Sequence, residues 1–237
     1  MEAIIPALYL IPVPLGNTPV DQVLPSYNRE VILQIHHFVV EEVRSARRFL
    51  KSVDRDINID ELVFYPMGKH ADSAVFREYL KPLANGESVG VISEAGCPAI
   101  ADPGAIIVAQ AHQMHLRVIP LVGPSSILLA LMASGFNGQN FAFHGYLPID
   151  TSARTSAIKK MEEKTRKEKQ TQIFIETPFR NEQLFRELLK CCHNSTKLCV
   201  AASITCIDEY IQTYTIEVWK KMPIPQLHKL PTIFLIF

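Results

Sequence analysis

The sequence predicts an α/β protein of two α/β domains, the first with a mostly parallel sheet and the second with a mixed sheet. Short apolar runs alternate with helical patterns through most of the 237 residues, as is typical of parallel sheets covered on both faces. Towards the end, strand patterns follow one another directly, which indicates antiparallel pairs. The alternation restarts after a Gly-Pro turn at Val122–Pro124, so we expect domains at residues 1–122 and 123–237.

Nine apolar runs rich in β-branched and aromatic residues are predicted as strands. In chain order they are Ala7–Pro12, Phe38–Glu41, Val89–Ser93, Val118–Val122, Phe141–Leu147, Gln172–Thr177, Leu198–Ser203, Tyr210–Trp219 and Thr232–Phe237. Six segments with apolar residues at helical spacing are predicted as helices. They are Val43–Val53, Ser73–Ala84, Ala105–His115, Ser126–Ser134, Arg154–Lys169 and Asn181–Cys192.

The composition predicts a folded chain with a substantial core, because 48% of the residues are hydrophobic and 20% are charged. Lysine plus arginine equal aspartate plus glutamate at 24 each, which argues against a protein that coats nucleic acid by bulk charge. The densest charge run, Lys159–Gln170, has six basic and three acidic residues. Two interpretations stay open for this run: the solvated face of a helix, or a patch that contacts phosphates.

We further expect a cytoplasmic protein without a membrane segment or a metal site. No apolar stretch approaches the roughly 18 residues of a membrane span, and the N-terminus lacks the basic region of a signal peptide. The five cysteines are odd in number and show no CxxC spacing, which favours reduced thiols. His112 and His115 lie three residues apart on a predicted helix, but no third metal ligand follows at a suitable spacing.

The loop Ser93–Gly104 is the strongest candidate for a ligand site. A buried strand ends at its first residue, and in open α/β sheets ligands bind at the carboxyl ends of strands. Gly96 lets the backbone approach a ligand closely, and the prolines that follow stiffen the path. Asp102 is predicted to cap the next helix, with Pro103 at its first position.

Two further Gly/Pro loops follow strands in the same way. Pro12–Thr18 contains Gly16 and comes after the first strand, and Val122–Ser126 comes after the fourth. Ser125 and Ser126 either cap the next helix or contact a ligand. The chain has no GxGxxG and no GxxxxGK[ST] pattern, so these loops suit a ligand that is not strongly anionic. No serine occupies a GxSxG elbow, which disfavours an α/β-hydrolase.

In this order, the loops resemble the motifs of the tetrapyrrole (corrin/porphyrin) methylase superfamily. The segments that carry this resemblance are Pro14–Asn17, Ser93–Pro98, Asp102–Gly104 and Val122–Ser126. Within the superfamily, the chain is most similar to the branch that methylates the ribose 2′-oxygen of a cytidine in small-subunit ribosomal RNA. The segments that match this branch are Glu41–Arg44, Phe141–Pro148 and Ile175–Arg180. Val43, Glu94 and Cys97 depart from its usual patterns, so the chain is identified as a divergent member.

The resemblance implies an S-adenosylmethionine-dependent methyltransferase whose cofactor lies in a cleft between the two domains, and typically a homodimer. It also implies that backbone groups make much of the contact with the cofactor. The cofactor-binding residues that it implies are Pro14, Leu15, Gly16, Glu94, Gly96, Cys97, Pro98, Ile100, Ser125, Ser126, Thr177, Ala202, Pro231 and Thr232.

Methyl transfer from a sulfonium is an in-line displacement, in which alignment of the reacting groups can supply about 7–11 kcal/mol of the barrier. A ribose hydroxyl also needs help in losing its proton, which a nearby carboxylate can give. The catalytic candidates are Glu42 and Glu176, with Arg44 to place a phosphate or the substrate. For each carboxylate, a purely structural role at the end of a helix or strand is the alternative.

Two other functions stay open beside the RNA methyltransferase. One is a methyltransferase for a tetrapyrrole or another small molecule, and the other is a non-catalytic member of the fold. A basic face that includes Lys159, Lys160 and Arg166 would favour RNA, and a deep apolar trough would favour a tetrapyrrole. A blocked cofactor cleft would favour the non-catalytic protein.

Overall fold

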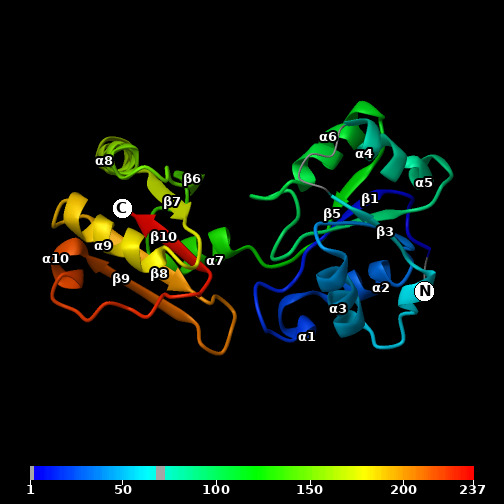
Figure 1. The fold of residues 1–237 in the computed structure, drawn as a ribbon, viewed down its shortest axis with the longest axis horizontal. Coiled ribbons are helices and arrows are strands. Elements are labelled where there is room, and N and C mark those ends of the chain that lie inside the picture. Colours follow the sequence, from blue (N-terminus) through cyan, green and yellow to red (C-terminus); the bar gives the residue numbers. More distant parts are fainter. Residues whose placement is uncertain (1–2, 68–72) are drawn as a thin grey trace. The chain divides into compact units, whose positions relative to one another are not determined.

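The computed structural model describes residues 3–67 and 73–237, and the chain divides into two compact units, Met1–Ser125 and Ser126–Phe237 (Figure 1). In the described residues, each unit has a five-stranded sheet with helices packed on it. The first sheet is parallel and the second is mixed, which confirms the predicted fold class.

The sheet of unit 1 has the strand order β3-β2-β4-β1-β5. Its strands are β1 (Leu8–Ile11), β2 (His37–Val40), β3 (Val63–Pro66), β4 (Val89–Ile92) and β5 (Val118–Pro120). Because every pairing is parallel, the carboxyl ends of all these strands lie at one edge of the sheet. That edge therefore gathers the loops that follow β1, β2, β4 and β5.

Helices cover both faces of this sheet, since successive strand residues point to opposite sides. They are α1 (Val20–Val23), α2 (Ser26–Ile32), α3 (Val43–Val53), η1 (Ile59–Glu61), α4 (Ser73–Tyr79), α5 (Lys81–Ala84) and α6 (Gly104–Gln113). Tyr9 and Phe38 belong to the core beneath α2 and α3. Leu8 and Val39, their neighbours in sequence, belong to the core beneath α4, α5 and α6. Figure 1 shows these two helical layers on opposite sides of the strands.

Gly90, in the middle of β4, leaves room for two large core side chains. A Cβ at this position would lie 2.7 Å from Ile11 Cδ1 and 2.9 Å from Phe38 Cδ1, closer than real contacts allow. Both side chains are fully buried, so this central strand needs the smallest residue between them.

The sheet of unit 2 has the strand order β6-β7-β10-β8-β9. Its strands are β6 (Phe141–Tyr146), β7 (Thr171–Ile175), β8 (Lys197–Ala202), β9 (Tyr210–Thr215) and β10 (Thr232–Ile236). β6 and β7 are parallel, whereas β10 is antiparallel to both β7 and β8, and β8 is antiparallel to β9. The last strand in sequence is therefore the central strand of the sheet.

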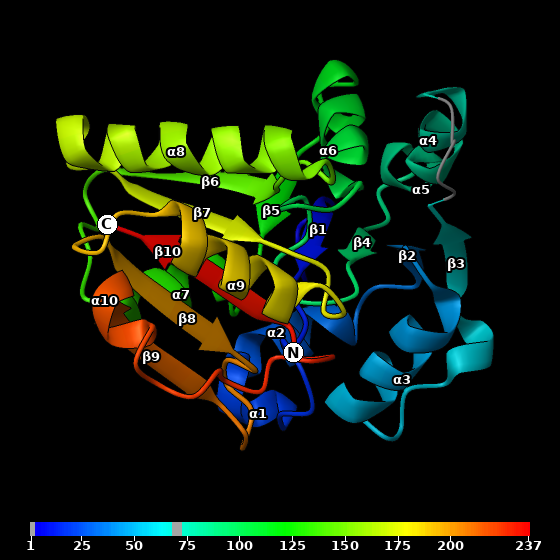
Figure 2. The same ribbon diagram turned by 60° about the vertical axis from the view of Figure 1, so that its left-hand side comes forward.

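Four helices of the described chain pack on this second sheet. They are α7 (Ser126–Ser134), α8 (Thr151–Glu168), α9 (Asn181–Cys191) and α10 (Ile216–Trp219). Phe234 and Phe185 share a core with Trp219, whose Nε1 donates to the Leu198 carbonyl at 2.9 Å. α7 packs against β9 and β10, and Figure 2 shows it behind the sheet, with α9 in front. The mixed sheet is thus covered on both faces.

Most predicted elements are confirmed within about three residues of their ends, but two expectations were wrong and some elements were not predicted. The predicted helix Ser73–Ala84 is two helices, because Pro82 has no N–H to continue the first. The predicted strand Tyr210–Trp219 ends at Thr215, which accepts a hydrogen bond from the Val218 N–H and starts α10. β3 was not predicted as a strand, nor α1 and α2 as helices; β3 is a short edge strand with exposed end residues.

No helix in residues 3–67 and 73–237 is long and apolar enough to cross a membrane. In these same ranges, no three side chains of His, Cys, Asp or Glu gather in a way that could hold a metal ion. All five cysteines are free thiols.

Candidate active site

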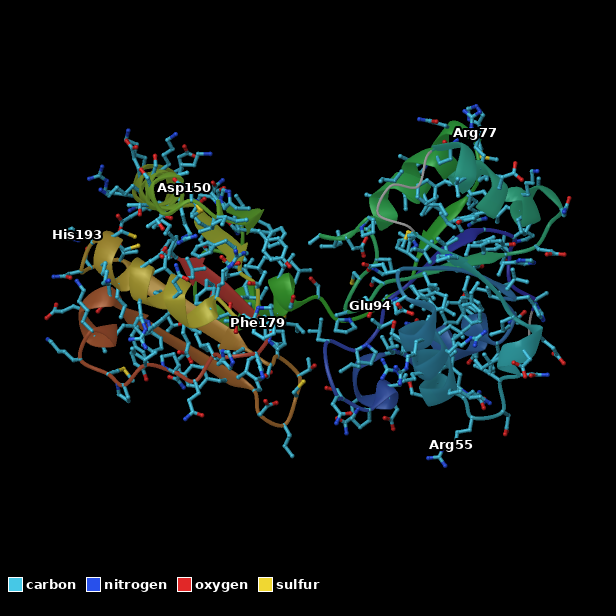
Figure 3. All side chains as sticks on the ribbon, in the orientation of Figure 1. Arg55, Arg77, Glu94, Asp150, Phe179 and His193 are labelled. Carbon is cyan, nitrogen blue, oxygen red and sulfur yellow. The ribbon has the colours of Figure 1, made fainter. Side chains whose placement is uncertain are left out.

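The carboxyl edge of the unit 1 sheet gathers the predicted loops. β4 lies between β2 and β1, and β1 lies between β4 and β5, so the segments after these four strands are neighbours. They include Pro12–Thr18, Glu41–Glu42, Ser93–Gly104 and Leu121–Ser125. In open parallel sheets this edge is where ligands bind. Figure 3 labels Glu94, which lies in the loop after β4.

Gly96 joins the loop after β4 to the loop after β1. Its N–H donates to the Val13 carbonyl at 3.1 Å, and the Val13 N–H donates back at 3.0 Å. Gly96 has a φ of +72°, and a Cβ here would lie 3.1 Å from Leu15 Cδ2 and 3.4 Å from the Pro124 carbonyl oxygen. The residue therefore serves both the left-handed backbone and the close packing of three loops.

Asp102 fixes the shape of the second half of the Ser93–Gly104 loop. Its Oδ1 accepts the Ala99 N–H at 2.8 Å and the Gly104 N–H at 2.7 Å. Ala99 and Ala101 have φ values of 67° and 61°, a conformation that residues with a Cβ adopt at a cost. Burial raises the pKa of Asp102, and the two N–H donors lower it. Pro103, not Asp102, precedes the first residue of α6, so the predicted capping position was wrong by one residue, although Asp102 does bind an N–H of the first turn.

Three acidic side chains lie near one another at this edge: Glu41, Glu94 and Asp102. Glu41 accepts the Glu94 N–H at 3.2 Å, and the Ser45 hydroxyl donates to Glu94 Oε1 at 2.5 Å. Burial raises the pKa of the Glu41 carboxyl, and the negative charges of Asp102 and Glu94 raise it further, against the Glu94 N–H, which lowers it. A carboxylate with a raised pKa is a better proton acceptor than an ordinary one.

The catalytic candidates Glu42 and Arg44 lie at the start of α3. Glu42 is exposed and accepts the Arg44 N–H at 3.0 Å, so it has a structural role as the N-cap of this helix. The Arg44 side chain is exposed. Glu41, which was not among the catalytic candidates, is the carboxylate that contacts the loop after β4. The signal in the sequence that could have identified Glu41 as a site residue was its position at the end of a strand.

The other residues expected near the cofactor in unit 1 differ in exposure. Pro14, Leu15 and Cys97 are half-buried, and the Cys97 thiol contacts the Pro124 carbonyl oxygen at 3.4 Å. Burial raises the pKa of that thiol, so it stays protonated. Gly16 and Ile100 are exposed, Pro98 is buried, and Ser125 and Ser126 are half-buried.

A cleft of about 1270 Å³ in unit 1 opens beside this edge. It is larger than the roughly 300–1,000 Å³ of most small-molecule sites. Its walls come from the loop after β1, from α1, α2 and α3, and from Ser93 and Glu94. The charged residues in its lining are Asp21, Arg29, Arg48 and Glu94.

In unit 2, the sheet order gathers the remaining predicted residues at one edge. β7 and β8 end where the antiparallel β10 begins, so Thr177, Ala202 and Thr232 follow or occupy neighbouring strand ends. Thr232 pairs directly with Ala202, and the Pro231 carbonyl accepts the Ser203 N–H at 3.0 Å. The predicted residues of this unit are thus close to one another, although they are far apart in sequence.

Glu176, the third catalytic candidate, is buried at the end of β7. It accepts the Thr177 N–H at 2.6 Å and pairs with Arg180 at 2.7 Å. Arg180 Nε and Asn181 Oδ1 are buried beside it without a hydrogen-bond partner in the described chain. An unpaired buried polar atom costs about 1–3 kcal/mol, so these two atoms leave hydrogen-bonding capacity unused at this edge.

The charge run on α8 forms a solvated face of the helix, the first of the two interpretations considered for it. Lys167 pairs with Glu163 at 2.6 Å, and Glu162 accepts the His193 N–H at 2.7 Å. Lys159 and Lys160 are exposed. The helix thus uses some of its acidic residues within unit 2 and leaves cations on its surface.

Comparison with known proteins gives sequence relatives named ribosomal RNA small subunit methyltransferase I. No family model matches the chain. A protein of Vibrio cholerae named ribosomal RNA small subunit methyltransferase I is 30% identical over 207 residues, 87% of this chain and 68% of the relative. Its namesake in Mesorhizobium japonicum is 30% identical over 213 residues, 90% of this chain and 68% of the relative. In Pseudomonas aeruginosa the namesake is 26% identical over 221 residues, 93% of this chain and 71% of the relative.

Solved structures share the fold at low sequence identity. The methyltransferase CobJ has a TM-score of 0.64 at 14% identity, covering 97% of this chain and 93% of its own. Diphthine synthase has a TM-score of 0.64 at 13% identity, with 98% and 89% covered. Uroporphyrin-III C-methyltransferase from Thermus thermophilus, solved with S-adenosyl homocysteine, has a TM-score of 0.55 at 14% identity, with 97% and 96% covered.

Proposed function

Because this chain belongs to the family of ribosomal RNA small subunit methyltransferase I, we propose that it is an S-adenosylmethionine-dependent methyltransferase acting on small-subunit ribosomal RNA. We propose the ribose 2′-oxygen of a cytidine as the acceptor atom. The observation that carries the proposal is the extent of the similarity, which spans 87% of the chain and so includes residues of both units. A similarity confined to one loop or one unit would support less.

The residues at the carboxyl edge of unit 1 fit S-adenosylmethionine. Leu15, Gly16, the Gly96–Ile100 turn and Ser125 would hold it, largely through the backbone. Gly96 supports this assignment, because its left-handed backbone packs the loop after β4 against Leu15 and the Pro124 carbonyl, so the loops that would hold the cofactor meet at this residue. The acidic side chains nearby suit a cationic ligand, and the absence of a phosphate-binding pattern agrees with one.

When bound, S-adenosylmethionine supplies a methyl group on a sulfonium, activated for displacement by an oxygen. We propose that Glu41 accepts the proton that the 2′-hydroxyl loses, since it is half-buried and its pKa is raised by burial. Arg44, exposed at the start of α3, would bind a phosphate next to the target ribose. Glu42 stays a second candidate for the base.

The predicted contacts in unit 2 stay proposals of the same kind. Within this unit, the residues proposed to contact the cofactor are Thr177, Ala202, Pro231 and Thr232. The unpaired Asn181 Oδ1 supports a polar ligand at their edge. Glu176 is neutralised by Arg180, so we propose that it positions the Thr177 backbone and does not accept a proton.

We also propose that the protein is a cytoplasmic homodimer, as the resemblance implies. The separate cores of the two units support a division into two domains near residue 123. Sedimentation equilibrium of the purified protein tests the dimer, and a monomer at micromolar concentration would contradict it.

Methylation of RNA in vitro tests the proposed function. Purified protein, S-adenosylmethionine with a labelled methyl group and an unmodified transcript of small-subunit ribosomal RNA are incubated, and the digested RNA is analysed by mass spectrometry. We expect one 2′-O-methylated cytidine. Label on a tetrapyrrole acceptor and none on RNA, whether the transcript is free or assembled into small subunits, would overturn the proposal.

A further inference from the structure

Positive charge is concentrated on one short segment of unit 1. The whole chain has a formal net charge of zero, yet five of the thirteen residues 43–55 are Arg or Lys, and Asp54 is the one acidic residue among them. This segment comprises α3 and the two residues that follow it. Figure 3 shows Arg55 beyond the end of α3.

The packing of α3 explains why these cations are available at the surface. The helix buries Ala46 and Leu50 against the sheet, which directs its basic side chains outward. Arg44 and Arg48 are four residues apart and therefore lie on the same side of the helix, and both are exposed. Lys51 is exposed as well.

The same helix forms one wall of the 1270 Å³ cleft. Ser45, Arg48, Phe49 and Ser52 belong to the lining, and α2 adds Arg29. Arg29 is held by an ion pair with Asp54, so its guanidinium has a defined position. The cleft thus has a basic and hydroxyl-bearing wall made by α2 and α3.

The cleft also contains the surface that unpaired nucleobases need. Phe49 lines it together with apolar side chains of α1, α2 and the strand ends. Proteins that bind single-stranded nucleic acid combine a basic groove along the backbone with aromatic or apolar surfaces for the bases. The lining reaches Ser93 and Glu94, so the cleft is continuous with the proposed catalytic edge.

We propose that the α2/α3 wall of this cleft binds the sugar–phosphate backbone of the substrate RNA strand beside the target nucleotide, with Arg48 and Arg29 as the phosphate ligands inside the cleft. This inference rests on the proposed function. It deepens that function by naming where the RNA strand runs. The acidic lining residues Asp21 and Glu94 restrict the phosphates to the α2/α3 side.

Salt-dependent RNA binding tests this surface. The probe is the unmodified small-subunit transcript, and the proteins are wild type, Arg48→Gln, Arg44→Gln/Arg48→Gln and the matched surface control Lys159→Gln/Lys160→Gln on α8. Each phosphate contact that is lost should reduce the slope of log K against log salt by about 0.7. We expect Arg48→Gln to weaken binding roughly threefold to tenfold near physiological salt, the double variant to weaken it further, and the α8 control to bind as wild type does.

Cofactor affinity, thermal unfolding, RNA binding and methylation together separate this proposal from the proposed function. S-adenosylhomocysteine affinity, measured by calorimetry, should be equal in Arg48→Gln and wild type, and thermal unfolding should show that both are folded. The α3 surface would be overturned if both arginine variants kept the RNA affinity and the salt slope of wild type, or if the α8 control lost as much affinity as they do. Methylation of RNA by the wild-type protein would uphold the proposed function in that case. RNA binding that depends on Arg48 without any methyl transfer by wild type would overturn the function and support the surface.

Discussion

Replacement of Asp102 tests the candidate cofactor loop most directly. In Asp102→Ala, the N–H groups of Ala99 and Gly104 lose the oxygen that accepts both, at a cost of about 1–3 kcal/mol each if they stay buried. The left-handed conformations of Ala99 and Ala101 cost about 1–2 kcal/mol each and then lack the contact that holds them. Since water reaches part of this half-buried loop, we expect a loss of about 2–4 kcal/mol in the free energy of unfolding.

Asp102→Asn is the matched control, because it keeps an oxygen in the place of Oδ1. We expect a loss below about 1 kcal/mol at neutral pH. Burial raises the pKa of Asp102, so the folded state binds the proton more tightly than the unfolded state. The contribution of this group to stability is therefore full below the ordinary carboxyl pKa and is lost as the pH rises through the raised value. Across that window, the stability of Asp102→Asn relative to wild type should increase with pH.

Urea unfolding followed by circular dichroism between pH 4 and pH 8 measures both variants, and calorimetry with S-adenosylhomocysteine measures the site. If the loop loses one backbone hydrogen bond to the ligand, affinity in Asp102→Ala should fall by about threefold to tenfold. Equal stability of Asp102→Ala and wild type would refute the structural reasoning. Wild-type affinity in a destabilised Asp102→Ala would show that this loop does not bind the cofactor.

Three other variants have definite expectations. Glu41→Gln should lower the turnover of RNA methylation by about 10²–10⁴-fold. The rate of the wild-type enzyme should rise with pH through a pKa above the ordinary carboxyl value. An unchanged turnover in Glu41→Gln would remove Glu41 from the mechanism. Arg154→Ala leaves Glu187 without its buried cation, which should cost about 3–5 kcal/mol in urea unfolding, and a loss below 1 kcal/mol would contradict this. Gly123→Ala places a Cβ 2.2 Å from the Cγ of the proline that follows β1, which should cost about 1–3 kcal/mol, whereas Gly138→Ala, with open space around it, should cost less than about 1 kcal/mol.

The fold class could be predicted because periodicity is a local property. The runs at Val89 and Leu198 are apolar over strand length, and α3 shows its buried stripe directly in the sequence. β3 was not predicted because an edge strand needs no continuous apolar run. Val63, the first residue of β3, is 41% exposed. The break between α4 and α5 depends on Pro82, a residue that ends helices and is itself a signal in the sequence.

The candidate site was predicted only in part, because its geometry depends on strand order. The sequence identified the Gly/Pro loops as strand-end loops, but nothing local says that β4 lies between β2 and β1. That order brings Glu41 to the Glu94 N–H, and so distinguishes Glu41 from its exposed neighbour Glu42. The cleft beside α3 likewise follows from long-range packing, which periodicity does not encode.

The position of β10 has a consequence for biosynthesis. β10 ends at Ile236 and lies between β7 and β8, so those strands have no partner between them until this segment has been translated. In unit 1, β5 is the last strand to be translated and lies at an edge of the sheet. Its pairing with β1 is therefore the only pairing in that sheet that waits for the last strand. At about 5–20 residues per second, unit 1 has roughly ten seconds to fold before the central strand of unit 2 is made. From the time each is made until β10 is made, β7 and β8 each expose an edge whose backbone groups another chain could pair with, so nascent unit 2 is where we expect chaperones to act.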